Sequence, residues 1–444
     1  MGAHLKMNVE AVYETAERTI VLTTGARYEF DKGVHKGIVS CYQRLNQERL
    51  VAHITFGHPF ASLSVEHQDK DSVVLHQIVQ STWYTKLVIR ADGVLEIYSM
   101  PRLELQFAGA FLPTYTGRRD GHTLLLDEIG GIGVYPCAWF KLRDDIGLAT
   151  RNWQLQYEGD RFCRMYVAVL PPRPFDWARS YRDRIAHWGV NPPWSFGHYP
   201  SAEMITSAAE YANIFVLHTQ IWKGKLSRLG VDLLTEEQIT EDSSYCSYAY
   251  QAVDEAALHQ VVQTAHNLGM KVVPYFSPTF SMSSGADFLE MVQRTLDQYG
   301  FDGAYFDGIT FDLQQGYELV RQARKMLGNR ILYIHSTWEP LMSRSVYCPF
   351  IDTYADYILR GEHPADFEDD AYLRYVLAGY NTSNTIGMVC HCYYPTEFVQ
   401  RIIDKTLSFN GRFYLALPET ATEQVLKDSY LPRLVAEGRE RGYL

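Results

Sequence analysis

Three carboxylates in the second half of the chain have the types and positions for acid, base or nucleophilic chemistry. Asp307 lies in the run Ala304-Tyr-Phe-Asp-Gly308, Asp356 lies in Tyr-Ala-Asp-Tyr, and Glu362 follows six residues later. Two carboxyl groups cleave a glycosidic bond when one attacks or stabilises the positive centre and the other protonates the leaving oxygen. We therefore predict that Asp307, together with Asp356 or Glu362, forms the catalytic carboxylate pair. The alternatives are a helix-capping role for Asp307 and a structural, hydrogen-bonded role for Asp356.

Imidazole and aromatic side chains follow similar apolar runs and suit the binding of a polyhydroxylated substrate. Histidine and carboxylate groups hydrogen-bond to hydroxyls, while Trp and Tyr rings offer an apolar face and a polar edge. For His335 and His391 the alternative is a hydrogen-bonded core histidine. The predicted substrate-binding residues are His218, Trp222, Tyr275, His335, Trp338, His391 and Glu419.

Other common chemistries lack their motifs. The glycine-rich run at 130–133 lies in a β-rich region without a following helix, so it does not predict a dinucleotide or phosphate site. No Gly-x-Ser-x-Gly elbow occurs. In Cys390-His391-Cys392, strand alternation places the histidine on the face opposite the two cysteines, which disfavours one shared zinc ion. We therefore predict neither a metal nor a cofactor.

Composition narrows the partners and the compartment. The 444 residues have a formal net charge of −11, with no basic run for a nucleic-acid backbone. No stretch is long and apolar enough to predict a membrane helix. The seven cysteines show no framework spacing, so we expect reduced thiols in a cytoplasmic protein. Export is the alternative if a signal peptide has been removed. The expected partner is an oligosaccharide or glycoside substrate, and a homo-oligomer is left open.

The first part of the chain predicts an all-β domain. Short alternating runs recur without helical periodicity, and residues 86–99 predict two strands joined by an Asp-Gly turn. An antiparallel β-sandwich over residues 1–172 is the natural interpretation. Proline-rich segments then flank residues 173–190, which we predict to be a linker helix.

Residues 191–444 alternate short apolar strands with amphipathic helices, which predicts a catalytic (β/α)8 TIM barrel and an α/β fold class for this part. An open, doubly wound sheet is the alternative. The expected strands are residues 194–199, 214–221, 271–276, 303–307, 331–335, 352–357, 385–391 and 412–417. Because active sites of such barrels lie at the carboxyl ends of the strands, this assignment selects the candidate residues above.

The chain resembles the retaining α-glycosidases of the α-galactosidase-like and α-glucosidase-like clans. The resemblance rests on residues 268–278, Leu-Gly-Met-Lys-Val-Val-Pro-Tyr-Phe-Ser-Pro, and residues 300–308, Gly-Phe-Asp-Gly-Ala-Tyr-Phe-Asp-Gly. It implies a β-sandwich before a barrel, with a nucleophile on strand four and an acid/base on strand six, which correspond to Asp307 and Asp356. The element typical of strand two is replaced here by His218-Thr-Gln-Ile-Trp222.

Two alternatives to this function have different site chemistry. In an amino-sugar glycosidase the substrate's own acetamido group attacks, and Asp307 orients that group. In a non-catalytic carbohydrate-binding barrel the aromatic residues remain without a working carboxylate pair.

Overall fold

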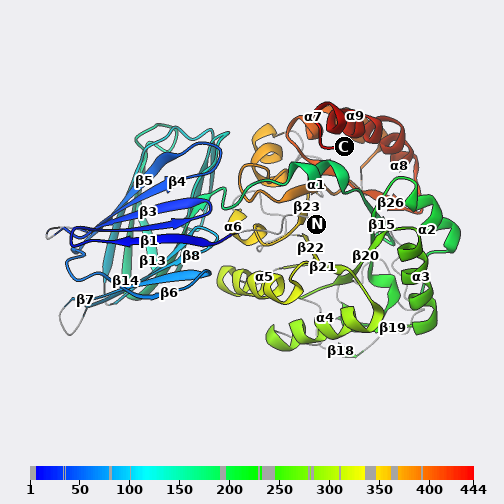
Figure 1. Cartoon of the computed structure of the whole chain (residues 1–444), viewed down its shortest axis with the longest axis horizontal. Coiled ribbons are helices and arrows are strands. Elements are labelled where there is room, and N and C mark those ends of the chain that lie inside the picture. Colours follow the sequence, from blue (N-terminus) through cyan, green and yellow to red (C-terminus); the bar gives the residue numbers. More distant parts are fainter. Residues whose placement is uncertain are drawn as a thin grey trace.

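The computed structural model describes residues 7–33, 35, 37–79, 83–100, 102–190, 197–228, 231–232, 246–278, 281, 285–309, 312–335, 347–361, 369–391 and 394–444. Figure 1 shows an antiparallel sheet at one end of the elongated molecule and a parallel sheet surrounded by helices at the other. Among the described residues, no helix is both long and apolar enough to cross a membrane.

The antiparallel part has fourteen connected strands, as the alternating sequence pattern predicts for an all-β region. In β3 (Ala26–Asp31), for example, buried and half-buried side chains alternate, which is typical of a strand with one face on a core. The predicted hairpin is present, and its turn ends at Gly93 with a φ of +77°. The other strands are β1 (Val9–Glu14), β2 (Arg18–Thr23), β4 (Ile38–Gln43), β5 (Arg49–Phe56), β6 (Ser64–Gln68), β7 (Ser72–Val79), β8 (Trp83–Arg90), β9 (Val94–Met100), β10 (Leu103–Gly109), β11 (Tyr115–Arg119), β12 (His122–Leu126), β13 (Gly131–Ile146) and β14 (Gln154–Leu170).

The parallel part is a nearly closed, barrel-like sheet. Its order is β25-β24-β23-β22-β21-β20-β16-β15-β26, and every neighbouring pair is parallel. The two end segments flank Tyr414 in one stretch of chain, so the sheet returns to where it began. The segments are β15 (Ile185–Trp188), β16 (Ile214–Leu217), β20 (Lys271–Phe276), β21 (Gly303–Asp307), β22 (Ile331–His335), β23 (Tyr357–Arg360), β24 (Ile386–Val389), β25 (Arg412–Phe413) and β26 (Leu415–Leu417).

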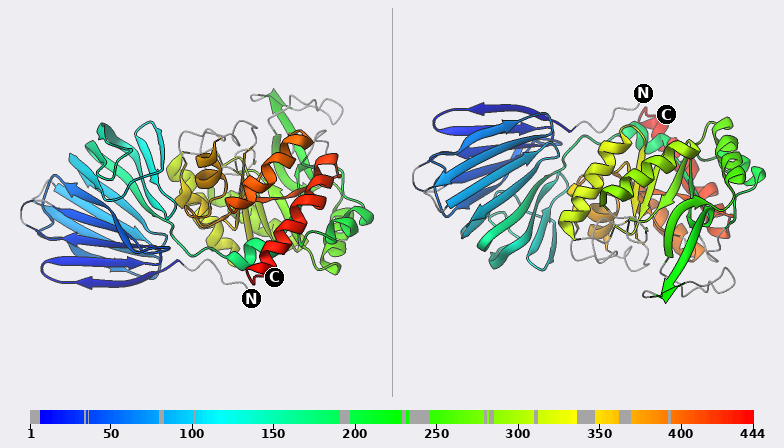
Figure 2. Two further views of the ribbon diagram at one scale, coloured as in Figure 1. Left: turned by 90° about the horizontal axis from the view of Figure 1, so that it is seen from above. Right: turned by 90° about the horizontal axis from the view of Figure 1, so that it is seen from below.

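Helices cover the outside of the parallel sheet (Figure 2). Asp254 caps α3 and Asp312 caps α5, each accepting a backbone N–H three residues ahead. The helices are α1 (Trp177–Arg182), α2 (Ala202–Ala209), α3 (Glu255–Asn267), α4 (Gly285–Tyr299), α5 (Leu313–Leu327), α6 (Pro349–Asp352), α7 (Thr396–Ser408), α8 (Ala421–Val425) and α9 (Leu431–Glu440), with short η1 (Thr219–Ile221), η4 (Tyr372–Leu377) and η5 (Leu426–Tyr430). A separate small sheet contains β17 (Trp222–Arg228), β18 (Val231–Asp232) and β19 (Cys246–Ala252).

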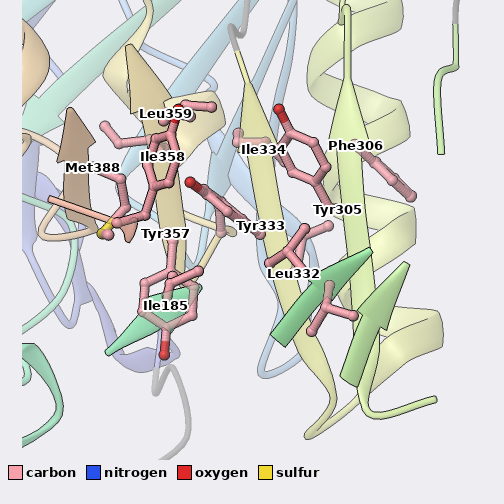
Figure 3. Packing of buried hydrophobic residues seen from close by; sticks show 14 of the residues in the cluster. Ile185, Tyr305, Phe306, Leu332, Tyr333, Ile334, Tyr357, Ile358, Leu359 and Met388 are labelled. Carbon is pink, nitrogen blue, oxygen red and sulfur yellow. The ribbon is translucent and has the colours of Figure 1, made fainter. Parts of the chain in front are cut away.

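Tyrosine rings occupy equivalent positions on three neighbouring strands. Figure 3 shows Tyr305 on β21, Tyr333 on β22 and Tyr357 on β23. The ring centroids of Tyr305 and Tyr333 are 4.8 Å apart, and those of Tyr333 and Tyr357 are 5.8 Å apart. Because paired residues of parallel strands point to the same face, this row fixes the register in which the strand ends meet.

Two predicted strands are wrong in position. The first strand of the parallel sheet is β15, inside the predicted linker helix, of which only α1 is helical; residues 197–199 are not a strand. A run as short as Ile185-Ala-His-Trp188 has no periodicity that separates strand from helix. The predicted strand at 352–357 is the end of α6 and a turn, and β23 begins only at Tyr357.

The two sheets are joined by a buried, aromatic contact. The hydroxyl of Tyr135 on β13 donates to the backbone oxygen of Tyr347, at 2.7 Å. The hydroxyls of Thr114 and Tyr375 are 2.6 Å apart, and the rings of Tyr166 and Phe350 pack at 5.9 Å. Side chains of the antiparallel sheet therefore belong to the same core cluster as the parallel sheet.

Candidate active site

Asp307 and His335 form the centre of the candidate site. They are paired residues at the carboxyl ends of β21 and β22, and the Asp307 Oδ1 lies 2.9 Å from the His335 Nδ1. About a quarter of the Asp307 side chain is exposed, against 12% for His335. The hydroxyl of Tyr305, two residues earlier on β21, lies 3.3 Å from the same His335 nitrogen. The carboxylate is thus held on one side and accessible on the other.

His218 and Tyr275 complete the cluster. His218 follows β16, Tyr275 lies near the carboxyl end of β20, and their ring centroids are 4.7 Å apart. The Tyr275 side chain hydrogen-bonds to Asp307. Three of the predicted substrate-binding residues are therefore brought together around the predicted nucleophile, at the ends of four successive strands.

The electrostatics favour an ionised Asp307. Burial by itself would raise the pKa of this carboxyl, but hydrogen bonding to His335 and the charge of that ring outweigh burial and hold the pKa below its ordinary value. Burial lowers the pKa of His218 to about 4, so that ring is neutral at pH 7. Asp307 is consequently a carboxylate at neutral pH, beside the neutral imidazole of His218.

His187 lies beneath this cluster and was missed because its strand was predicted as helix. The ring is fully buried, with centroids 5.5 Å from Tyr305, 5.4 Å from Tyr333 and 4.3 Å from Tyr414. Neither ring nitrogen has a hydrogen-bond partner among the described residues. Burial holds its pKa well below the ordinary value, so the ring is neutral. The short apolar run around His187 was the only sequence feature that indicated a strand there.

Asp356 lies apart from the Asp307 cluster, in surroundings that do not suit its predicted role as acid/base. It precedes β23 and accepts hydrogen bonds from Arg179 at 2.5 Å, Arg324 at 2.7 Å and the backbone of Leu332 at 2.8 Å. Leu332 lies three residues before His335 on β22, which is about 10 Å along the strand. Although burial opposes ionisation, the two arginines lower the pKa of Asp356 to about 2. A general acid needs the opposite shift.

Trp222 and Glu419 are engaged in structural contacts. The Trp222 side chain is fully buried, its indole N–H donates to the backbone oxygen of Tyr275 at 2.7 Å, and its ring packs on Phe276. It is a core residue, which does not suit the predicted contact with substrate. Glu419 is bound by the Lys427 Nζ at 2.7 Å and lies near the Tyr211 hydroxyl, which gives it a surface ion pair.

His391 is engaged in a buried hydrogen bond. Its Nε2 lies 2.9 Å from the Glu423 Oε1, and the His391 and Glu423 side chains are 0% and 2% exposed. Glu423 also closes the capping box of α8 through Thr420. This arrangement joins the end of β24 to the last helices and does not suit the predicted contact of His391 with substrate. Glu423 was missed because it is 32 residues away in the sequence.

Two predicted residues, Glu362 and Trp338, lie outside the described residues. Within the described ranges, no group of three His, Cys, Asp or Glu side chains is arranged to hold a metal ion. The cluster around Asp307 offers a carboxylate, imidazoles and hydroxyls to a ligand.

Comparison with known proteins gives no family assignment. No family model matches the chain, and no curated protein matches it. Among solved structures, an uncharacterized protein from Listeria monocytogenes EGD-e in complex with glucose, magnesium and calcium has 10% identity and a TM-score of 0.42. The match covers 96% of this chain and 54% of the Listeria chain.

Two further similar structures are named glycosidases. A glucosidase II alpha subunit has 8% identity and a TM-score of 0.43, covering 97% of this chain and 68% of its own. The GH31 alpha-xylosidase from Xanthomonas citri has 9% identity and a TM-score of 0.34. The match covers 98% of this chain and 73% of the xylosidase chain. The chain spans about half the length of the Listeria protein. At these TM-scores the similarities do not establish a family.

Proposed function

We propose that this chain is a glycoside hydrolase that cleaves an α-linked glycosidic bond with retention, and that Asp307 is its nucleophile. The observation that supports the proposal is the ionised, quarter-exposed Asp307 carboxylate at the end of β21, held at 2.9 Å by His335. The proposal includes a (β/α)8 barrel for the parallel part, after a β-sandwich in residues 1–172.

In this mechanism Asp307 attacks the anomeric carbon, and a second carboxyl protonates the leaving oxygen. Retaining enzymes hold the two carboxyl groups about 5 to 5.5 Å apart. Asp356 lies near the opposite ends of the strands, so Glu362, two residues after β23, stays the predicted acid/base. One hydrogen bond from His335 fixes the Asp307 carboxylate, while His218 and Tyr275 face the same position from the neighbouring strands.

The nucleophile is tested with Asp307→Ala and a panel of nitrophenyl α- and β-glycosides. We expect the wild type to release nitrophenol from an α-glycoside and the variant to lose several orders of magnitude in turnover. Azide, added to the variant, takes the place of the missing carboxylate and should restore turnover, giving a glycosyl azide of inverted configuration. Full activity in the variant would remove Asp307 from the mechanism.

Asp312→Asn is the matched control, because asparagine caps a helix as well as aspartate does and the residue lies five positions from Asp307. Its turnover should equal that of the wild type. Release only from N-acetylhexosaminides, with no azide rescue, would assign Asp307 the orienting role of a substrate-assisted enzyme. Binding of sugars without any release would identify a non-catalytic carbohydrate-binding protein.

A further inference from the structure

Asp92 is a buried carboxylate at the contact between the two sheets. It lies in the turn between β8 and β9 and is 1% exposed. Its Oδ2 accepts the hydroxyl of Tyr317 at 2.7 Å and the hydroxyl of Tyr354 at 2.6 Å, and its Oδ1 accepts the backbone N–H of Val94 at 3.1 Å. One side chain of the antiparallel sheet is therefore bound to two tyrosines of the parallel part.

These tyrosines belong to the elements that follow the two central strands of the candidate site. Tyr317 lies in the first half of α5, the helix after β21, which ends at Asp307. Tyr354 lies between α6 and β23, in the segment after β22, which ends at His335. The Asp92 carboxylate thus links the segment that follows Asp307 to the segment that follows His335.

A second contact fixes the other end of α5. Arg324 donates to the backbone oxygen of Tyr354 at 2.8 Å and to Asp356 at 2.7 Å. The carboxyl-terminal half of the helix is therefore anchored within the parallel part itself. Its amino-terminal half, which is closer in the chain to Asp307, is hydrogen-bonded through Tyr317 to the antiparallel sheet.

We propose that Asp92 is a positioning residue for the candidate site, acting through Tyr317 and Tyr354 to keep Asp307 and His335 in hydrogen-bonding register. The kinetic part of this proposal rests on the glycosidase function proposed above. Its structural part does not. Catalytic groups require positions fixed to about 0.5 Å, and displacement by about 1 Å costs about a hundredfold in rate. A merely stabilising role for Asp92 would leave the Asp307–His335 geometry unchanged in the folded protein.

The test removes only the two hydroxyls, in the double variant Tyr317→Phe/Tyr354→Phe, and keeps both rings. The single variant Tyr317→Phe, in which Asp92 keeps the Tyr354 hydroxyl, serves if the double variant does not fold. The matched control is Tyr375→Phe, which removes another hydroxyl at the same contact, 2.6 Å from Thr114, on an element that follows β23. Circular dichroism and thermal unfolding establish that each variant is folded.

Two readouts separate positioning from stability. The first is the pKa of Asp307, measured by ¹³C NMR titration of its carboxyl carbon in the full chain, which does not depend on activity. We expect a rise in the double variant, since a looser His335 contact stabilises the carboxylate less, and no change in Tyr375→Phe. The second is kcat, expected to fall about tenfold or more while KM changes by less than about twofold.

An unchanged Asp307 pKa in the folded double variant, or an equal shift in Tyr375→Phe, would overturn the positioning role. Failure of the proposed function is visible separately. If Asp307→Ala keeps full activity while the NMR titration still shifts in the double variant, the glycosidase mechanism is wrong and the link from Asp92 to Asp307 remains.

Discussion

Asp307 and His335 face one another at the last paired position of β21 and β22, where the Asp307 Oδ1 lies 2.9 Å from the His335 Nδ1. The pair depends on strand register, because a slip of one residue would turn either side chain to the opposite face of the sheet. The row of tyrosines at Tyr305, Tyr333 and Tyr357, two residues earlier on β21 and β22, packs in the same register. The site is therefore set by packing inside the sheet as much as by its own hydrogen bonds.

Replacement of His335 by alanine should move the acid limb of the activity profile. His335 lowers the pKa of Asp307 by hydrogen bonding and charge, so its removal lets burial raise that pKa. Asp307 would then stay protonated to a higher pH, and the fall of kcat/KM on the acid side would begin at a higher pH. A profile of kcat/KM from pH 3 to 8 measures this. Tyr305→Phe removes only the 3.3 Å contact between the Tyr305 hydroxyl and the His335 Nδ1, and should give a smaller shift of the acid limb. If the acid limb of His335→Ala lies at the same pH as that of the wild type, His335 does not lower the pKa of Asp307.

Replacement of Asp356 by alanine should destabilise the fold and leave the chemistry intact. The change leaves Arg179 and Arg324 without a shared carboxylate, and loss of one partner of a buried ion pair costs about 3 to 5 kcal/mol. Urea unfolding at pH 7 measures the loss. At a temperature where the variant is folded, kcat should match the wild type. A selective loss of kcat with normal stability would return Asp356 to the active site.

The same residue predicts a pH dependence of stability. The folded-state pKa of Asp356 is depressed to about 2, below the ordinary value of 3.8. Its contribution is therefore fully present above about pH 4 and is lost as the pH falls through about 2. The difference in unfolding free energy between wild type and Asp356→Ala should shrink between pH 4 and pH 2. A constant difference over this range would show that the carboxylate is not ionised preferentially in the folded state.

His391→Ala should lower stability without weakening substrate binding. The change leaves the Glu423 Oε1 without its imidazole partner, at a cost of about 1 to 3 kcal/mol for a buried acceptor. Thermal unfolding and KM, measured on the same preparation, separate the two roles. We expect a lower Tm and an unchanged KM. A raised KM at an unchanged Tm would support the original prediction of a substrate-binding histidine.

Trp222→Phe should likewise act on stability alone. The variant leaves the Tyr275 backbone oxygen without the indole N–H, which costs about 1 to 3 kcal/mol for a buried acceptor. Because the Trp222 side chain is fully buried, KM for any glycoside substrate should stay within error of the wild type. A large rise in KM with normal unfolding would place the ring at the substrate.

The central strands were predictable from local sequence. Residues 271–276, 303–307 and 331–335 were assigned with the bounds that β20, β21 and β22 have, since each is a buried apolar run flanked by turn signals. His218, Tyr275 and His335 could therefore be assigned to the same end of the sheet as Asp307. Strand order alone was enough to gather these side chains.

Asp356 could not be assigned correctly, because its role depends on residues far away in the sequence. An apolar run around Tyr354 and Tyr357 suggested a strand that ended near Asp356, whereas β23 begins after it. Arg179 is 177 residues distant, and no local pattern indicates that its side chain reaches this carboxylate. The same holds for Asp92, which is 225 residues from Tyr317. Local periodicity predicts elements, while buried polar pairs depend on how the elements pack.

The edges of the antiparallel sheet bear on self-association of the molecule. Among the described residues, β1, β6 and β11 each pair on one side only, and unpaired strand edges are templates for growth by another chain. The pairing of β1 shifts register at Val9/Ala11 and that of β6 at Val65/His67, while β11 ends in two arginines. Such bulges and charges interrupt a continuous ladder. A strand from another chain therefore has no uninterrupted ladder to join at these three edges.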